Sequence, residues 1–86
     1  MYQPEEIVIT EHAMARYRER ISDSSIPDIC RRLRQYWRDG VIIAVFGKKI
    51  YKRYDKLVLV VKNRKLRTVY LWDTLNLDRH KEVATA

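Results

Sequence analysis

The amino-acid sequence predicts one α+β domain, with two N-terminal helices packed on a four-stranded antiparallel sheet. From residue 10 to residue 39, apolar residues recur every three or four positions, which is the period of an amphipathic helix. After Gly40 the period becomes two, and β-branched and aromatic residues dominate, as they do in strands. The links between the expected strands hold only two or three residues. Such links suit the hairpins of a meander and are too short for parallel crossovers.

Length and composition indicate a single domain over residues 1–86, with its core at about residues 7–72. A chain this short buries only ~60–65% of the surface that its unfolded form exposes. Cys30 is the one cysteine, so no internal disulfide can form, which fits a reducing compartment. The N-terminal residues lack the apolar stretch of a signal peptide, and the longest apolar run, residues 41–46, is far shorter than the ~20 residues of a membrane helix. We therefore expect a cytoplasmic protein without a membrane partner.

The first helix is expected between Thr10 and Ile21. The Thr10 hydroxyl can accept a hydrogen bond from an otherwise unpaired backbone N–H, and Glu11 places a negative charge in the first turn. Its buried stripe is expected to consist of Ala13, Met14, Tyr17 and Ile21. The short apolar run before the helix, residues 7–9, can either extend the sheet or pack under the helix.

The second helix is expected to begin after Ser25 and to end at Gly40. Ser25 and Asp28 resemble a capping box, and Pro27 is tolerated in a first turn. Its apolar face is expected to hold Ile26, Ile29 or Cys30, Leu33 and Trp37, with Arg31, Arg34 and Arg38 on the opposite face.

Four strands are expected, at residues 41–46, 49–54, 57–62 and 66–72. The third is apolar on both faces, so we expect it in the centre of the sheet with the helices on one side. The second mixes basic and aromatic residues and is expected to be partly exposed. Alternation predicts that Leu66, Thr68, Tyr70 and Trp72 share one face of the last strand. Residues 75–86 fit either a short helix or an extended tail.

The charge of the chain favours an anionic partner. Eighteen Lys and Arg against eleven Asp and Glu give a net charge of +7, and six tyrosines and two tryptophans are interleaved with the basic residues. Aromatic rings can stack on bases while cations hold phosphates, so we expect RNA as the partner; the alternative is a merely solvated surface. The candidate nucleic-acid-binding residues are Arg31, Arg34, Arg38, Lys48, Lys49, Lys52 and Arg53. A further basic group, Lys62, Arg64, Lys65 and Arg67, is expected at a hairpin tip, where charges are commonplace.

Metal or cofactor chemistry is not expected. His12 and His80 are the only histidines, which with one cysteine cannot build a zinc or iron site of three or four soft or imidazole ligands. With only two glycines the chain has no glycine-rich phosphate loop. Cys30 falls on the apolar face of a helix, where a thiol is usually inert.

A row of His12, Arg16 and Arg20 is the sharpest pattern in the first helix. Spacing by four residues sets them along a rise of ~12 Å, long enough to follow a nucleic-acid backbone. Glu19 can pair with Arg16 and offset the repulsion between the two arginines. Spacing alone favours the plainer alternative of a solvated helix face.

The run Ile9–Ile21 resembles the opening of a family of small bacterial and phage proteins with a His-Ala-x-x-Arg-x-x-x-Arg helix. The last core strand of that family often carries Thr-Val-Tyr, matched here by Thr68–Tyr70. The family is similar to the BrnT and RelE/ParE toxins and to the wider barnase–colicin–RelE nuclease superfold, and the likeness covers about residues 7–72. The resemblance implies a metal-independent ribonuclease or RNA-interacting toxin-like protein with a cognate antitoxin, although some relatives of the superfold act on gyrase instead.

The resemblance leads to a concrete catalytic hypothesis. His12 would act as acid or base while the ribose 2′-hydroxyl attacks the adjacent phosphate, and Arg16 and Arg20 would hold that phosphate. The hydroxyls of Thr68 and Tyr70 would position the substrate, provided that the first helix crosses their face of the sheet; otherwise they are ordinary core or rim residues. The alternative function is a non-enzymatic basic protein, such as a phage or bacterial regulator or inhibitor that binds nucleic acid or a host protein. An enzyme needs His12 within reach of Thr68 or Tyr70, whereas a binding protein needs only an exposed basic surface.

Overall fold

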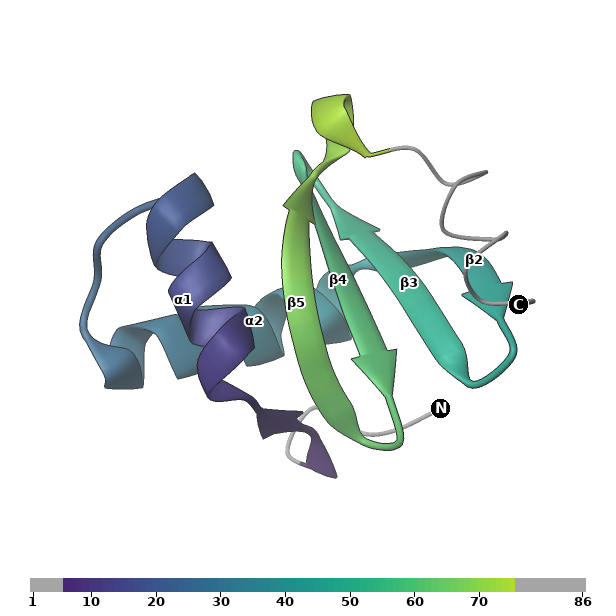
Figure 1. Cartoon of the computed structure of the whole chain (residues 1–86), viewed down its shortest axis with the longest axis horizontal. Coiled ribbons are helices and arrows are strands. Elements are labelled where there is room, and N and C mark those ends of the chain that lie inside the picture. The colour runs from purple at the N-terminus through teal and green to yellow at the C-terminus, as the bar shows by residue number, and fades with distance from the viewer. Residues whose placement is uncertain (1–5, 76–86) are drawn as a thin grey trace.

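The computed structural model describes residues 6–75 and shows two helices beside a twisted sheet (Figure 1). The elements in chain order are β1 (Val8–Ile9), α1 (Glu11–Arg20), α2 (Ile26–Asp39), β2 (Val41–Phe46), β3 (Lys49–Tyr54), β4 (Leu57–Lys62), β5 (Lys65–Leu71) and a short 3₁₀ helix, Trp72–Thr74. The α+β class, both helices and the four expected strands are confirmed. Apart from Leu75, the expected C-terminal segment lies outside the described residues. Over the described range, no helix is long and apolar enough to cross a membrane.

The sheet has five strands in the order β1-β5-β4-β3-β2, so the prediction of a four-stranded antiparallel sheet is wrong by one strand. Strands β2 to β5 form the expected antiparallel meander with β4 in the centre. The additional strand, β1, pairs in parallel with β5, and the amide of Val8 donates to Arg64 O at 2.8 Å. Two residues are too few to show an alternation, and their partner lies more than fifty positions away, so local patterns gave no signal for this pairing.

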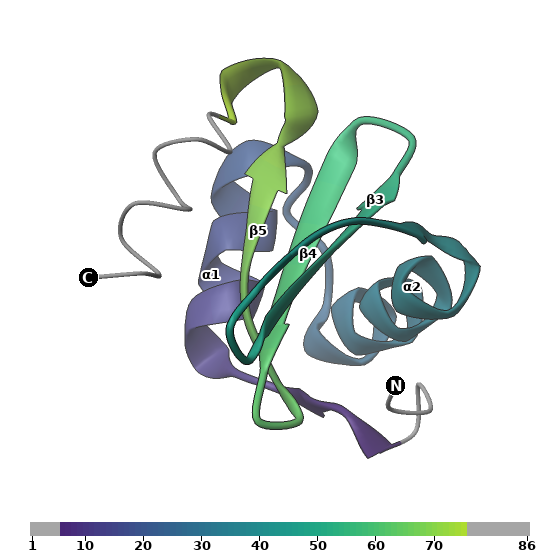
Figure 2. The ribbon, with the colours of Figure 1, turned by 90° about the vertical axis from the view of Figure 1, so that its right-hand side faces the viewer.

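Both helices lie on the same side of the sheet (Figure 2). From α1, Ala13 and Tyr17 enter the core, and from α2, Leu33 and Trp37 do so. The sheet side chains buried against them are Leu57, Leu59, Val61, Leu66 and Val69. Ile7 is also buried in this core, so the run at residues 7–9 both extends the sheet and packs under the helices. Ile26 was expected in the apolar face of the second helix but is 52% exposed.

The other face of the sheet carries no α-helix within residues 6–75, and we call it the open face. Its centre is a second small core of Tyr51, Val58 and Val60. Around them pack partly buried side chains that include Phe46, Tyr70 and Trp72. In the described part of the chain, aromatic side chains therefore provide much of the cover of this face.

A β-bulge in β5 decides which side chains reach which face. Val61 pairs with Leu66, but the next residue of β4, Val60, pairs with Thr68, so Arg67 is one residue in excess. An extra residue shifts the alternation of the strand. As a result Leu66 points to the helices, whereas Thr68 and Tyr70 belong to the open face. The prediction that Leu66 shares a face with them is wrong for this reason.

The predicted helix caps are confirmed. Thr10 Oγ1 accepts from the Ala13 amide at 3.1 Å, and Ser25 Oγ accepts from the Asp28 amide at 3.4 Å. Thr10 Oγ1 also donates to Leu66 O at 2.7 Å, so this hydroxyl ties α1 to β5. Gly40 ends α2, where an added Cβ would lie only 2.8 Å from Tyr36 O. Such a close approach requires glycine at this junction.

Thr10→Val tests the link between α1 and β5. The substitution keeps the shape of the side chain but removes the cap and leaves Leu66 O without its hydroxyl donor. We expect a loss of about 1–2 kcal/mol in the free energy of unfolding, measured by urea denaturation. Ser25→Ala removes a cap whose hydrogen bond is longer and exposed to solvent, so it should lower the free energy of unfolding by a smaller amount. Equal losses in the two variants would contradict the role of the Thr10–Leu66 bond.

Candidate nucleic-acid interface

A pocket of about 340 Å³ lies on the open face. We call it the open-face pocket. It is lined by Lys49, Tyr51, Val60, Lys62, Arg67, Thr68 and Tyr70. Three of these residues are cationic, three carry hydroxyl groups and none is acidic. The pocket therefore suits an anion that accepts several hydrogen bonds.

The strand register explains how three cations come together. Lys49 and Lys62 are directly opposite each other in the β3–β4 ladder, so both side chains leave the sheet on the same face. Arg67 joins them because the bulge in β5 places it beside Thr68. Like charges directly opposite each other destabilise a sheet. A bound anion would remove this repulsion.

Tyr51 supplies a buried phenol at the base of the pocket. It is 1% exposed, and the ring of Phe46 packs edge-on against it with centroids 5.3 Å apart. Burial, with a smaller contribution from Tyr70, raises the pKa of the Tyr51 phenol. The hydroxyl thus remains protonated at neutral pH and adds no negative charge to the pocket.

The row His12, Arg16 and Arg20 is only partly directed at this pocket. His12 is exposed on α1, and Arg16 Nη1 pairs with Glu19 Oε2 at 2.6 Å. That hydrogen bond and the charge of Arg16 lower the pKa of the Glu19 carboxyl. Neither His12 nor Arg16 lines the open-face pocket.

Arg20 is the member of the row that reaches the last strand. Its Nη1 donates to Val69 O at 2.6 Å, and its guanidinium carbon lies 5.3 Å from the ring centroid of Tyr70. In the described part of the chain, β1 pairs only with Lys65 and Leu66 of β5, so Val69 lies beyond the paired stretch of that sheet edge. The side chain of Arg20 therefore crosses the edge of the sheet, from the helix side to Tyr70.

The condition of the catalytic hypothesis, that the first helix crosses the face carrying Thr68 and Tyr70, is not met. Ala13 and Tyr17 of α1 pack on the opposite face, against Leu66 and Val69. The bulge in β5 and the single-sided packing of the helices cause this arrangement. Arg20 and Tyr70 are brought into contact, whereas His12 does not join Thr68 in one pocket.

The three arginines predicted on α2 lie on the helix side of the sheet and have partners. Arg31 pairs with Asp28 at 3.4 Å, and Arg38 pairs with Asp39 at 3.1 Å. Arg34 Nη2 donates to Ile7 O at 3.3 Å. These residues do not form a surface continuous with the open-face pocket.

Lys52 was expected to contact nucleic acid, but the structure buries it at 6% exposure. Its Nζ donates to Trp37 O at 2.7 Å and lies 4.5 Å from the centroid of the Trp37 ring. Burial lowers the pKa of this ammonium group. Alternation along β3 points Lys52 at the last turn of α2, where a cation stabilises the helix terminus. It is a structural residue and offers no surface to a phosphate.

The other basic residues predicted around β3 are divided between two places. Lys49 lines the open-face pocket, and Lys48 is exposed in the β2–β3 turn. The Arg53 guanidinium lies 4.2 Å from the ring centroid of Trp72, and its Nε donates to Asp55 O at 2.8 Å. Arg53 and Trp72 therefore form a cation–π pair beyond the pocket.

Two residues of the pocket, Lys62 and Arg67, were interpreted from the sequence as ordinary charges of a hairpin tip. The sequence did contain a signal for Lys62, because the register of the hairpin formed by β3 and β4 places residue 62 opposite residue 49. The position of Arg67 depends on the bulge, for which the sequence alone gave no indication.

Comparisons of this chain with protein-family models, curated proteins and solved structures found no match. The resemblance to BrnT and RelE/ParE toxins therefore stays a prediction.

Tyr51→Phe tests the burial of the pocket phenol. Because the pKa of Tyr51 is raised in the folded state, the unfolded chain loses this proton first, near pH 10. The free energy of unfolding should therefore decrease as the pH rises above about 10, and less steeply in Tyr51→Phe. Denaturant titrations between pH 8 and pH 11 measure both slopes; Lys52 is present in both proteins, so its contribution cancels. Parallel pH profiles would contradict the prediction.

Proposed function

We propose that this protein binds single-stranded RNA on the open face of its sheet. The observation that carries the proposal is the open-face pocket, in which Lys49, Lys62 and Arg67 meet without an acidic residue. A backbone phosphate in this pocket would relieve the repulsion within the Lys49–Lys62 pair and accept hydrogen bonds from arginine and hydroxyl groups.

The aromatic residues around the pocket support a single-stranded partner. Tyr70 and Trp72 lie on the same face, and Trp72 already carries the Arg53 guanidinium on its ring. Unpaired bases stack on such rings with little dependence on sequence. The hydroxyls of Thr68 and Tyr70 beside the cations favour RNA over DNA, because they can bond the ribose 2′-hydroxyl.

A metal-independent ribonuclease activity at the same pocket is the second candidate. Tyr70 lines the pocket next to Arg67 and also contacts Arg20, so a phenol proton and positive charge adjoin one phosphate position. Cations stabilise the charge that develops in phosphoryl transfer. Since His12 does not line the pocket, we rank RNA binding first and cleavage second. A toxin-like role with a cognate antitoxin depends on this second candidate, whereas a host-protein partner would belong to a non-enzymatic binding protein.

Arg67→Gln, compared with Arg31→Gln, tests the RNA-binding proposal. Each variant removes one positive charge, but only Arg67 belongs to the pocket, while Arg31 is exposed on α2 and pairs with Asp28. We expect Arg67→Gln to weaken binding of a single-stranded RNA about tenfold and to reduce the slope of log affinity against log salt by about 0.7. Arg31→Gln should change affinity less than about twofold. Fluorescence anisotropy at several salt concentrations measures both effects, and equal losses would reduce the proposal to unspecific charge attraction.

Tyr70→Phe and His12→Ala separate two possible routes of cleavage. If the pocket cleaves RNA, Tyr70→Phe should slow cleavage about a hundredfold in the presence of a chelator, whereas His12→Ala should leave the rate within about twofold. Gel analysis of a labelled single-stranded RNA measures the rates. Loss of cleavage in His12→Ala alone would restore the hypothesis based on the first helix, and binding without any cleavage would eliminate the enzyme.

A further inference from the structure

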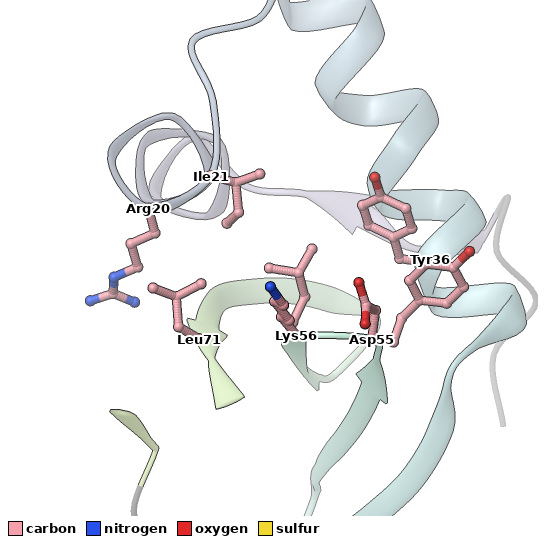
Figure 3. Close-up of a pocket in the computed structure, with 8 residues that line it drawn as sticks. Arg20, Ile21, Tyr36, Asp55, Lys56 and Leu71 are labelled. Carbon is pink, nitrogen blue, oxygen red and sulfur yellow. The ribbon is translucent and has the colours of Figure 1, made fainter. Parts of the chain in front are cut away.

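A second pocket of about 340 Å³ lies on the helix side of the sheet, between the end of α1, the outer half of α2 and the β3–β4 turn (Figure 3). We call it the turn pocket. Its apolar lining comes from Ile21, Leu57 and Leu71, which belong to the rim of the main core. Its volume is at the lower end of the range of small-molecule sites and matches a ligand of nucleotide size.

Two stacked tyrosines form one wall of the turn pocket. The rings of Tyr36 and Tyr54 have centroids 4.7 Å apart and an interplanar angle of 19°. Burial, followed by the proximity of Tyr17, raises the pKa of the Tyr36 phenol, so the Tyr36 ring stays uncharged at neutral pH. A neutral pair of rings favours the stacking of a third flat ring.

The β3–β4 turn supplies two charged groups of opposite sign. Asp55 and Lys56 rise from this turn into the space between α1 and the tyrosines, with Lys56 on the side of Arg20 (Figure 3). The turn backbone is anchored at both residues, since Arg53 Nε donates to Asp55 O and the Trp72 amide donates to Lys56 O, each at 2.8 Å. Among the described residues, neither side chain has an ion-pair partner within 4.0 Å, so both are available to a ligand.

We propose that the turn pocket binds a guanine nucleotide. The base would stack on the Tyr36–Tyr54 wall and present its two neighbouring N–H donors to the Asp55 carboxylate. Adenine presents a donor and an acceptor at the same edge, and the acceptor would face the carboxylate unfavourably. The phosphate would lie towards Lys56, at the end of the pocket where Arg20 lies (Figure 3).

Arg20 connects the turn pocket with the open-face pocket. It lines the turn pocket, while its guanidinium contacts Val69 O and the ring of Tyr70 across the sheet edge. The guanine can therefore come from a free nucleotide or from an RNA strand that passes round β5 at Arg20. The RNA source rests on the proposed function, whereas the free nucleotide does not.

Titration of the full chain with guanosine monophosphate and adenosine monophosphate tests the site. We expect guanosine monophosphate to shift the NMR amide signals of residues 54–56 and to bind about tenfold more tightly than adenosine monophosphate. Asp55→Asn should reduce this preference to less than about threefold, and asparagine tolerates the left-handed backbone of this position, φ +54°. Tyr54→Leu should weaken binding about tenfold through the loss of stacking, while Tyr54→Phe should retain it.

Equal binding of the two nucleotides, or unchanged affinity in Tyr54→Leu, would overturn the inference. A parallel titration uses oligouridine with and without one guanine. If Asp55→Asn weakens only the guanine-containing strand, the inference holds and the source is RNA. If guanosine monophosphate binds but neither oligonucleotide does, the inference holds for a free nucleotide and the proposed RNA binding fails. If both oligonucleotides bind equally and the mononucleotide leaves residues 54–56 unshifted, RNA binding stands and the turn pocket is overturned.

Discussion

The packing of β4 on both faces is the constraint on which the rest of the structure depends. Val58 and Val60 on one side, and Leu59 and Val61 on the other, are all at most 3% exposed. Helices bury one side, whereas among residues 6–75 the open face covers Val58 and Val60 with side chains of the sheet and of the 3₁₀ segment that follows it. Large aromatic residues provide this cover because each ring buries much apolar area. The aromatic rings of the open face therefore contribute to the stability of the fold whatever the molecule binds.

The bulge at Arg67 joins this structural requirement to the candidate site. Without an extra residue, a strand that places Leu66 against the helices would place Thr68 and Tyr70 there as well. The bulge lets Leu66 and Val69 both face the main core while Thr68 and Tyr70 turn to the open face. It also brings Arg67 to Lys49 and Lys62. The bulge thus accounts both for the side chains of β5 that enter the main core and for the cluster of three cations in the open-face pocket.

Local sequence patterns were sufficient for most of the fold. The N-caps at Thr10 and Ser25, the stop at Gly40 and the meander depend on residues close together in the chain, and the structure confirms all of them. The pairing of β1 with β5 and the bulge depend on contacts between distant residues, which a period cannot reveal.

The candidate site was harder to predict from the sequence than the fold, because it also depends on contacts between distant residues. Lys49, Thr68 and Tyr70 were identified and do share a pocket, whereas Lys52 turns to the core. Its direction follows from the register of β3 against α2 and not from its charge.

The net charge of the chain is +7, and the ion pairs determine which of its cations are left without an acidic partner. On the helices, Arg16, Arg31 and Arg38 each have an acidic partner within 3.4 Å. In the described part of the chain, no such partner is found for Lys49, Lys62 or Arg67. Paired charges contribute little to the distant field, whereas a cluster of like charges in a concave site concentrates it. Three helix arginines, Arg20, Arg32 and Arg34, also lack an acidic partner among the described residues, and each donates to a neutral oxygen. The open-face pocket differs from them because its three cations line one concave site and so concentrate the field there.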